Sequence, residues 1–149
     1  MSYGNDMTTQ ELTEAGLAAE LRVAVMRLRR RLVAERHPDN ELSISAMAVL
    51  GCLHVRGEQT AADLARHERV QPPTMTRTIK WMADGGYVVK RPHETDGRQL
   101  LVSLTDKGRE IVLADRERRD AWLARRLAEL DADDRAVLQQ AIPILARLA

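Results

Sequence analysis

The segment from Gln71 to Asp84 carries cations and hydroxyls at a spacing that suits the reading of duplex DNA. On a helix that advances about 100° per residue, these groups gather on one side, opposite Met75, Ile79 and Met82. Arginine can bond guanine bidentately, and threonine can contact a base or a thymine methyl group. A helix N-terminus also offers N–H groups and a positive dipole end to phosphate. The outward side consists of Gln71, Pro73, Thr74, Thr76, Arg77 and Lys80.

A second cation lies at a predicted turn within the stretch RPHETDGRQLLVSLTDKG, residues 91–108. Asp96-Gly97 is a turn dipeptide, and Arg98 beside it could extend its guanidinium into a narrow minor groove, whose negative potential attracts cations. The charge of Asp96 cannot attract DNA, so we expect its carboxylate to hold Arg98 or the turn by hydrogen bonding. The residues that we expect beside phosphate are Lys90, Arg91 and His93.

The local charge allows this interpretation without requiring it. Residues 66–98 contain seven Lys and Arg against four Asp and Glu, although the net charge of the chain is only +1. Such an excess favours an anion-binding surface, but a solvated helix face explains Arg77 and Lys80 equally well. Asp96 and Arg98 could likewise form a surface ion pair of little energetic value. The chain has two Trp, two Tyr and no Phe, too few aromatics for a typical single-strand binder.

Hydrophobic periodicity and capping residues predict four helices in the first part of the chain, and the last of them carries this cationic face. Either Ser43 or Ser45 can cap the second helix, and Thr60 can cap the third, with Asp63 returning the bond as in a capping box. Prolines are tolerated in a first helical turn, so Pro72-Pro73 marks a helix start. The predicted helices span about residues 9–35, 43–57, 60–67 and 71–84.

The remaining elements are two strands and two helices. Residues 87–91 and 100–105 are rich in strand-forming residues and flank the turn, so they predict a β-hairpin. Thr105 can cap a long helix over residues 106–130. A last helix begins near Asp131, and we expect Pro143 to kink or split it. The fold class is therefore mainly α with a small β-hairpin wing: a winged helix-turn-helix flanked by N- and C-terminal dimerisation helices.

The flanking helices carry apolar stripes that the small middle lobe cannot cover. A two-fold pair of chains would cover them and would present two recognition helices to one face of a duplex. We therefore expect a homodimer, although a bundle within one chain is an alternative. The division is residues 1–41 and 106–149 for dimerisation and 42–105 for DNA binding. The expected dimerisation residues are Leu17, Leu21, Leu127, Leu130, Ile142, Leu145 and Leu148.

Two segments, TMTRTIKWMADGGYVVKR (residues 74–91) and DGRQLLVSLTDKG (residues 96–108), resemble the MarR family of bacterial transcription regulators. The shared features are a Thr-Arg recognition helix, a glycine followed by an apolar entry to the wing, D-x-R at its tip and L-T-x-x-G before the next helix. The flanking helices also have the expected number and length, so the resemblance extends over nearly the whole chain. The Pro72-Pro73 pair departs from the Ser, Gly or Ala of many members and removes backbone donors, which leaves phosphate contacts there in question.

The resemblance implies a regulator, in the first place a repressor, that binds a palindromic operator as a homodimer. It implies that Thr74, Thr76, Arg77 and Lys80 face the major groove, and that Arg98 enters the minor groove with Asp96 as its support. It also implies release by a small, often aromatic or anionic, ligand, whose binding residues in this chain the sequence leaves unknown.

Other classes of protein fit the sequence less well. It contains no nucleophile elbow, P-loop, dinucleotide fingerprint or H-E-x-x-H, and its four histidines, His37, His54, His67 and His93, are scattered, so we expect neither an enzyme nor a metal or other cofactor. The polar N-terminus and short apolar runs favour a cytoplasmic location without a membrane span. Two alternatives stay open: a winged helix that binds only protein, and a redox sensor using Cys52, whose apolar neighbours favour an inert thiol.

Overall fold

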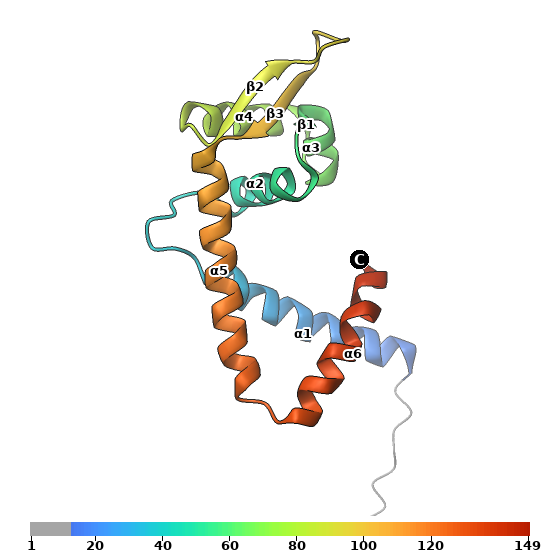
Figure 1. The fold of residues 1–149 in the computed structure, drawn as a ribbon. Helices are drawn as coiled ribbons and strands as arrows, with labels where there is room; N and C mark the ends of the chain where they lie inside the picture. Colours follow the sequence, from blue (N-terminus) through green and yellow to red (C-terminus); the bar gives the residue numbers. More distant parts are fainter. Residues whose placement is uncertain (1–12) are drawn as a thin grey trace, which may run out of the picture. The chain divides into compact units, whose positions relative to one another are not determined.

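The computed structural model describes residues 13–149. Their helices and strands follow one another in the order helix, helix, strand, two helices, two strands, two helices (Figure 1). The elements are α1 (Glu14–Ala34), α2 (Ile44–Arg56), β1 (Gln59–Thr60), α3 (Ala61–His67), α4 (Pro72–Asp84), β2 (Val88–Pro92), β3 (Leu100–Leu104), α5 (Asp106–Ala128) and α6 (Ala132–Leu148). The chain divides into two compact units between Ala34 and Glu35, so α1 belongs to the first and all other elements to the second.

Helix α1 begins at Glu14, and residues 9–12 of the predicted first helix lie outside the described residues. None of its residues is buried. Apolar side chains such as Leu17 and Met26 are more than half exposed. The helix predicted from the leucine periodicity is therefore present, but its apolar side chains remain accessible to solvent.

The predicted helix caps are confirmed where hydroxyl residues precede a helix. The Ser43 hydroxyl accepts a hydrogen bond from the Ala46 N–H at 3.1 Å, which selects Ser43 over Ser45 as the cap of α2. Thr60 caps α3 by accepting from the Asp63 N–H at 3.0 Å. The Asp63 carboxylate pairs with Arg66 and does not return a bond to Thr60, so the predicted capping box is only half formed.

The wing belongs to a three-stranded antiparallel sheet with the strand order β1-β3-β2. The hairpin of β2 and β3 was predicted, but β1, which pairs Gln59 with Val102 and Thr60 with Leu101, was not. A strand of two residues has no alternation that a sequence pattern could reveal, because its existence depends on the pairing partner. In Figure 1 the hairpin extends beyond the rest of its unit and ends in a narrow tip.

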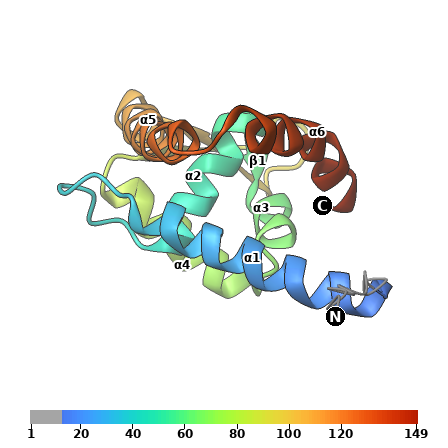
Figure 2. The ribbon, with the colours of Figure 1, turned by 90° about the horizontal axis from the view of Figure 1, so that it is seen from below.

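The core of the second unit lies between α2, α3, α4, the sheet and the first half of α5. Its side chains include Leu50, Leu64 and Val102, which are inaccessible to solvent. Helix α2 packs against α5. In Figure 2, α5 is seen nearly along its axis. The predicted inward face of α4 is confirmed, because Met75, Ile79 and Met82 are all buried. This packing leaves the opposite face of α4 turned to solvent.

The glycine of the L-T-D-K-G stretch is required by a close approach between two backbones. Thr105 caps α5 by accepting from the Gly108 N–H at 3.1 Å, as predicted. A Cβ atom on Gly108 would lie only 2.1 Å from the carbonyl oxygen of Tyr87. The first turn of α5 can therefore pack against the start of the wing only with glycine at this position.

The two last helices differ in detail from their predicted ranges. Helix α5 ends at Ala128, two residues before the predicted end at Leu130. Helix α6 continues through Pro143 from Ala132 to Leu148, so of the two expected effects of this proline the split is wrong, and the kink stays a prediction. A single proline removes one backbone donor and strains one turn, which the flanking helical turns can tolerate. Within residues 13–149, no helix combines the length and the apolar character that a bilayer crossing requires.

Candidate nucleic-acid interface

The first turn of α4 offers no unpaired backbone donor at its first three positions. Pro72 and Pro73 have no N–H, and the Thr74 N–H donates to the Gln71 carbonyl at 3.0 Å. The Gln71 side chain makes no capping bond, although its backbone occupies the cap position. The two prolines therefore leave this helix terminus fewer N–H groups for phosphate than the sequence expectation assumed, and side chains must supply most of the contacts.

Two threonine hydroxyls on α4 are occupied within the helix. The Thr76 hydroxyl donates to the Pro72 carbonyl and the Thr78 hydroxyl donates to the Thr74 carbonyl, both at 3.0 Å. Each hydroxyl proton is thus committed, so toward a ligand these residues present oxygen lone pairs and methyl groups. Such groups match amino donors on bases or a thymine methyl group better than guanine acceptors.

The two cations of α4 differ in their partners. The Arg77 side chain is exposed and makes no hydrogen bond or ion pair with any residue from 13 to 149. Lys80 donates to the Asp84 carboxylate at 2.8 Å, one turn further along the helix. This hydrogen bond raises the pKa of Lys80 and lowers the pKa of Asp84. Because both side chains are well exposed, the pair can open at little cost.

An open groove accompanies the exposed face of α4. It has a volume of about 410 Å³ and lies between α4 and the start of α2. Sequence reasoning missed Thr78 and Ser43, which line it, because its two walls come from separate helices. The lining residues are Ser43, Ala46, Thr74, Arg77, Thr78 and Trp81. Trp81 also stacks on Tyr87 with ring centroids 6.1 Å apart, so it braces the end of the helix.

Asp96 holds the wing tip and Arg98 in the way that the sequence suggested. One Asp96 carboxylate oxygen accepts the Arg98 backbone N–H at 3.1 Å and the Arg98 Nε–H at 3.4 Å. The other oxygen accepts from the Gln99 side-chain amide at 3.4 Å. The Arg98 side chain is 94% exposed, so its guanidinium can still turn toward a ligand.

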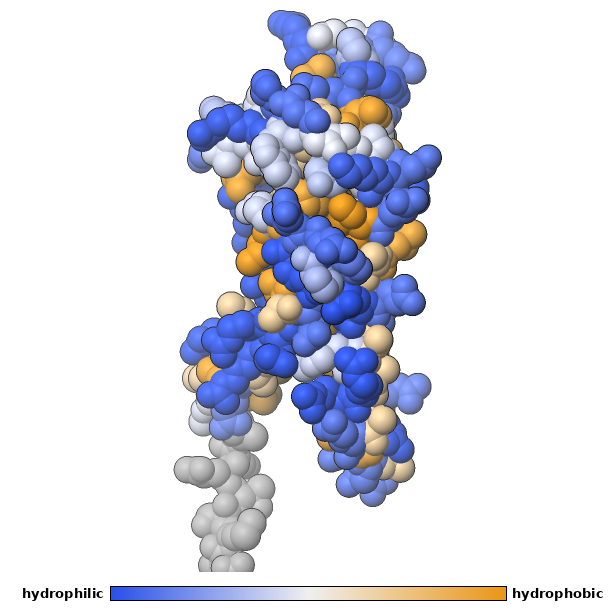
Figure 3. Space-filling model, turned by 90° about the vertical axis from the view of Figure 1, so that its left-hand side faces the viewer, coloured by the Kyte–Doolittle hydropathy of each residue, from blue (hydrophilic) through white to orange (hydrophobic). Residues whose placement is uncertain are grey.

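The other wing residues divide into occupied and available groups. The His93 ring nitrogen Nδ1 accepts the backbone N–H groups of Thr95 at 3.2 Å and Asp96 at 3.4 Å, which directs it into the tip. Arg91 makes a two-pronged pair with Glu58. Lys90 is exposed, and its side chain makes no hydrogen bond or ion pair in the described part of the chain. Its charge helps to lower the pKa of Asp84. Figure 3 shows mainly hydrophilic residues at the top of the molecule, where the wing lies.

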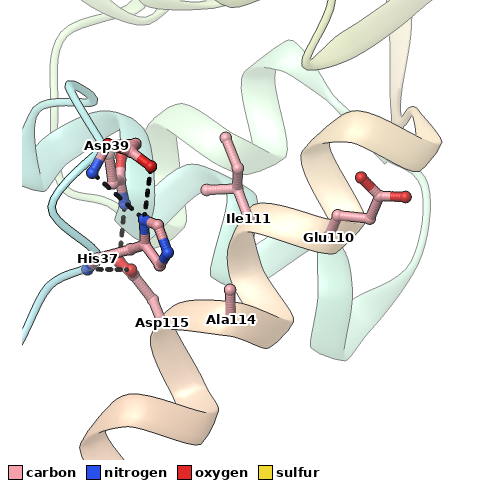
Figure 4. Close-up of a pocket in the computed structure, with 7 residues that line it drawn as sticks. His37, Asp39, Glu110, Ile111, Ala114 and Asp115 are labelled. Carbon is pink, nitrogen blue, oxygen red and sulfur yellow. Dashed lines mark hydrogen bonds and ion pairs between the residues drawn. The ribbon is translucent and has the colours of Figure 1, made fainter.

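A separate pocket of about 270 Å³ lies between the α1–α2 connection and α5, within the second unit. Figure 4 shows the Asp115 side chain reaching the backbone of His37 there. Asp115 is buried and accepts from the His37 N–H at 3.1 Å and the Asn40 side-chain amide at 2.8 Å. The pocket is lined by His37, Asp39, Asn40, Glu110, Ile111, Ala114 and Asp115. Three carboxylates among seven residues disfavour an anionic occupant.

The dimerisation residues predicted on α6 are all accessible. Ile142 is 64%, Leu145 39% and Leu148 71% exposed, and no residue of α6 is buried. Leu127, near the end of α5, and Leu130, just after it, are half-buried. Leu17 and Leu21 of α1 are exposed and half-buried, respectively. Among residues 13–149, the apolar side chains of α6 therefore remain accessible to solvent.

Comparisons of the sequence and of the fold with known proteins agree with one another. A model described as the MarR family matches residues 42–100. The uncharacterized HTH-type transcriptional regulator Mb0904 of Mycobacterium bovis is 44% identical over 136 residues, which cover 91% of this chain and 94% of that protein. A MarR family protein of Bacillus stearothermophilus has a TM-score of 0.78 at 21% identity, covering 89% of this chain and 92% of its own. A MepR mutant of Staphylococcus aureus, bound to an oligodeoxyribonucleotide, has a TM-score of 0.65 at 15% identity, with 89% and 98% coverage.

Proposed function

Because the chain belongs to the MarR family of DNA-binding, winged helix-turn-helix transcriptional regulators, we propose that it binds a palindromic operator as a homodimer and represses transcription there. Helix α4 enters the major groove and the wing tip enters the adjacent minor groove. The observation that carries this proposal is the state of two cations: Arg77 on α4 is unpaired among the described residues, and Arg98 at the tip is almost fully exposed.

The chemistry of α4 suggests how the major groove is read. Arg77 can bond the O6 and N7 acceptors of guanine, and Thr76 presents a lone pair and a methyl group beside it. Since the first turn has no free amide, phosphate binding falls to side chains, with Lys80 available after it leaves Asp84. Arg98 supplies the minor-groove contact, which is strongest where A·T pairs narrow the groove.

Dimer formation is supported by the uncovered apolar residues of α6. Val137, Ile142 and Leu148 are each more than 60% exposed, which is unfavourable for an isolated chain in water. Light scattering at micromolar concentration should return twice the chain mass of 16.8 kDa. Ile142→Glu combined with Leu148→Glu should return the single mass, whereas Val55→Glu, at an exposed apolar residue of α2, should remain a dimer. A single-chain mass for the unaltered protein would end the dimer proposal.

Repression and ligand release complete the proposed function. A dimer seated on an operator that overlaps a promoter excludes polymerase from it. The pocket between the α1–α2 connection and α5 is our candidate ligand site, and its carboxylates favour a small neutral or cationic molecule. Transcription in vitro from a promoter that contains the selected operator should fall as protein is added. A rise would make the protein an activator.

The DNA-binding test starts from fragments of the source genome selected on the unaltered protein. Arg77→Ala and Arg98→Ala should each weaken binding to the selected duplex by about 1–3 kcal/mol, measured by fluorescence anisotropy. Arg125→Ala removes the same charge about 28 Å along α5 from its first residue and should leave affinity unchanged. Log affinity should fall linearly with log salt concentration. Failure to select any duplex would favour the alternative of a protein-binding winged helix.

A further inference from the structure

We propose that Arg91 positions the wing and does not bind DNA phosphate, because its guanidinium ties β2 to the residue that precedes β1. Arg91 Nη2 lies 2.5 Å from Glu58 Oε1, and Arg91 Nε lies 3.1 Å from Glu58 Oε2. Two parallel N–H···O bonds to one carboxylate form the strongest and most directional of side-chain pairs. The proposal rests on the DNA-binding function proposed above and assigns a role within it.

The register of the sheet explains how residues 33 positions apart in sequence can meet. Leu101 of β3 is the Cα partner of both Thr60 in β1 and Arg91 in β2, so these three residues form one row across the sheet. Residues of one row project from the same face. With neighbouring strands about 4.8 Å apart, β1 and β2 are separated by about 10 Å. The long Arg91 side chain therefore reaches over β3 to Glu58, two residues before Thr60.

This tie acts where the sheet is weakest. Strand β1 has two residues and pairs with β3 alone, so few backbone bonds hold it. The hairpin that carries Arg98 is anchored to the rest of its unit partly through this sheet. A side-chain pair from β2 to the residue just before β1 limits twisting of the hairpin, and thereby fixes where its tip points.

The charge balance around Arg91 argues against a phosphate contact. Glu58 neutralises the guanidinium, and Glu94 lies 3.7 Å from it as a second carboxylate. If Arg91 turned to phosphate, it would leave the Glu58 carboxylate unpaired beside DNA. Lys90 lies in the neighbouring row, opposite Val102. Its side chain makes no hydrogen bond or ion pair with any residue from 13 to 149, although its charge helps to lower the pKa of Asp84. Of the two adjacent cations, Lys90 is the one available to phosphate.

Three substitutions in the full chain separate positioning from phosphate binding, with affinity for the selected duplex measured across a salt series. Glu58→Gln removes a negative charge near DNA and breaks the pair. Positioning predicts that it weakens binding about threefold, whereas a phosphate-binding Arg91 would be released and binding would tighten. Arg91→Ala should weaken binding to a similar degree with the salt slope preserved. Lys90→Ala should flatten the slope by about 0.9.

A charge exchange and a DNA-free measurement complete the test. Glu58→Arg combined with Arg91→Glu keeps the net charge and should restore most of the affinity. Hydrogen exchange of peptides covering β1 and the wing tip, without DNA, should be faster in Glu58→Gln and Arg91→Ala and unchanged in Lys90→Ala. If no duplex binds but exchange still responds, the proposed function fails and the structural tie stands.

Two results would overturn the positioning role. One is tighter binding by Glu58→Gln together with a flatter salt slope for Arg91→Ala. The other is unchanged affinity and unchanged exchange in both variants.

Discussion

The carboxylate of Asp115 accepts a hydrogen bond from the side-chain amide of Asn40 at 2.8 Å, which joins α5 to the connection that follows α1. The other carboxylate oxygen accepts the His37 N–H at 3.1 Å. Asn40 in turn accepts the Leu42 N–H at 3.0 Å, so one buried acid organises the entry to α2. A buried carboxylate with several donors is costly to remove, because its partners remain desolvated without it.

Asp115→Ala should therefore lower the free energy of unfolding by about 2–3 kcal/mol, measured by urea denaturation. Asp120→Ala, at an exposed position of the same helix, is the control and should change it by less than about 0.5 kcal/mol. Equal losses in the two variants would show that the buried network contributes nothing specific.

A pair of glycine substitutions tests the backbone contact between α5 and the wing. Gly108→Ala places a Cβ atom 2.1 Å from the Tyr87 carbonyl oxygen, so the backbones must separate. We expect a loss of about 2–4 kcal/mol in the free energy of unfolding. Gly51→Ala within α2 meets no atom within 4 Å and should stabilise by up to about 1 kcal/mol through helix propensity. A stable Gly108→Ala protein would contradict this packing.

Asp84→Asn should strengthen operator binding. The Asp84 carboxylate holds Lys80 at 2.8 Å, and its hydrogen bond to that ammonium lowers its own pKa, so it stays ionised beside the proposed DNA surface at neutral pH. Neutralising it frees Lys80 and removes a repulsive charge. Affinity should rise about two- to fivefold, with a salt slope steeper by up to about one. Glu129→Gln, at the far end of α5, controls for net charge and should leave both quantities unchanged.

The thiol of Cys52 should react slowly at neutral pH, which tests the redox-sensor alternative. Burial raises the pKa of this thiol, and the nearby charge of Glu68 raises it further, so the thiolate fraction at pH 7 is smaller than in a free cysteine. Alkylation by iodoacetamide should be at least about tenfold slower than for the unfolded chain and should accelerate with rising pH. A folded protein that reacts as fast as the unfolded one would revive the sensor.

The sequence predicted the helices, the turn and the caps of the site better than the contacts between its side chains. Proline at a helix start, a D-G turn and hydroxyl caps are local signals, and they located α4, the wing and the start of α5 correctly. The same local signals could not show that Arg91 reaches Glu58, 33 positions away. That contact depends on which strands pair and in which register.

Local order and chemical type therefore follow from the sequence alone: helix periodicity, capping and turn residues act within a few positions, so they define a winged helix-turn-helix and place Arg77 on its outward face. The tertiary structure alone decided which charged groups remain available. Strand β1 exists only because β3 lies beside it, and through it Glu58 meets Arg91. Asp115 is buried only because the α1–α2 connection folds against α5. Such long-range juxtapositions result from packing and burial of the whole unit, which no short stretch of sequence specifies.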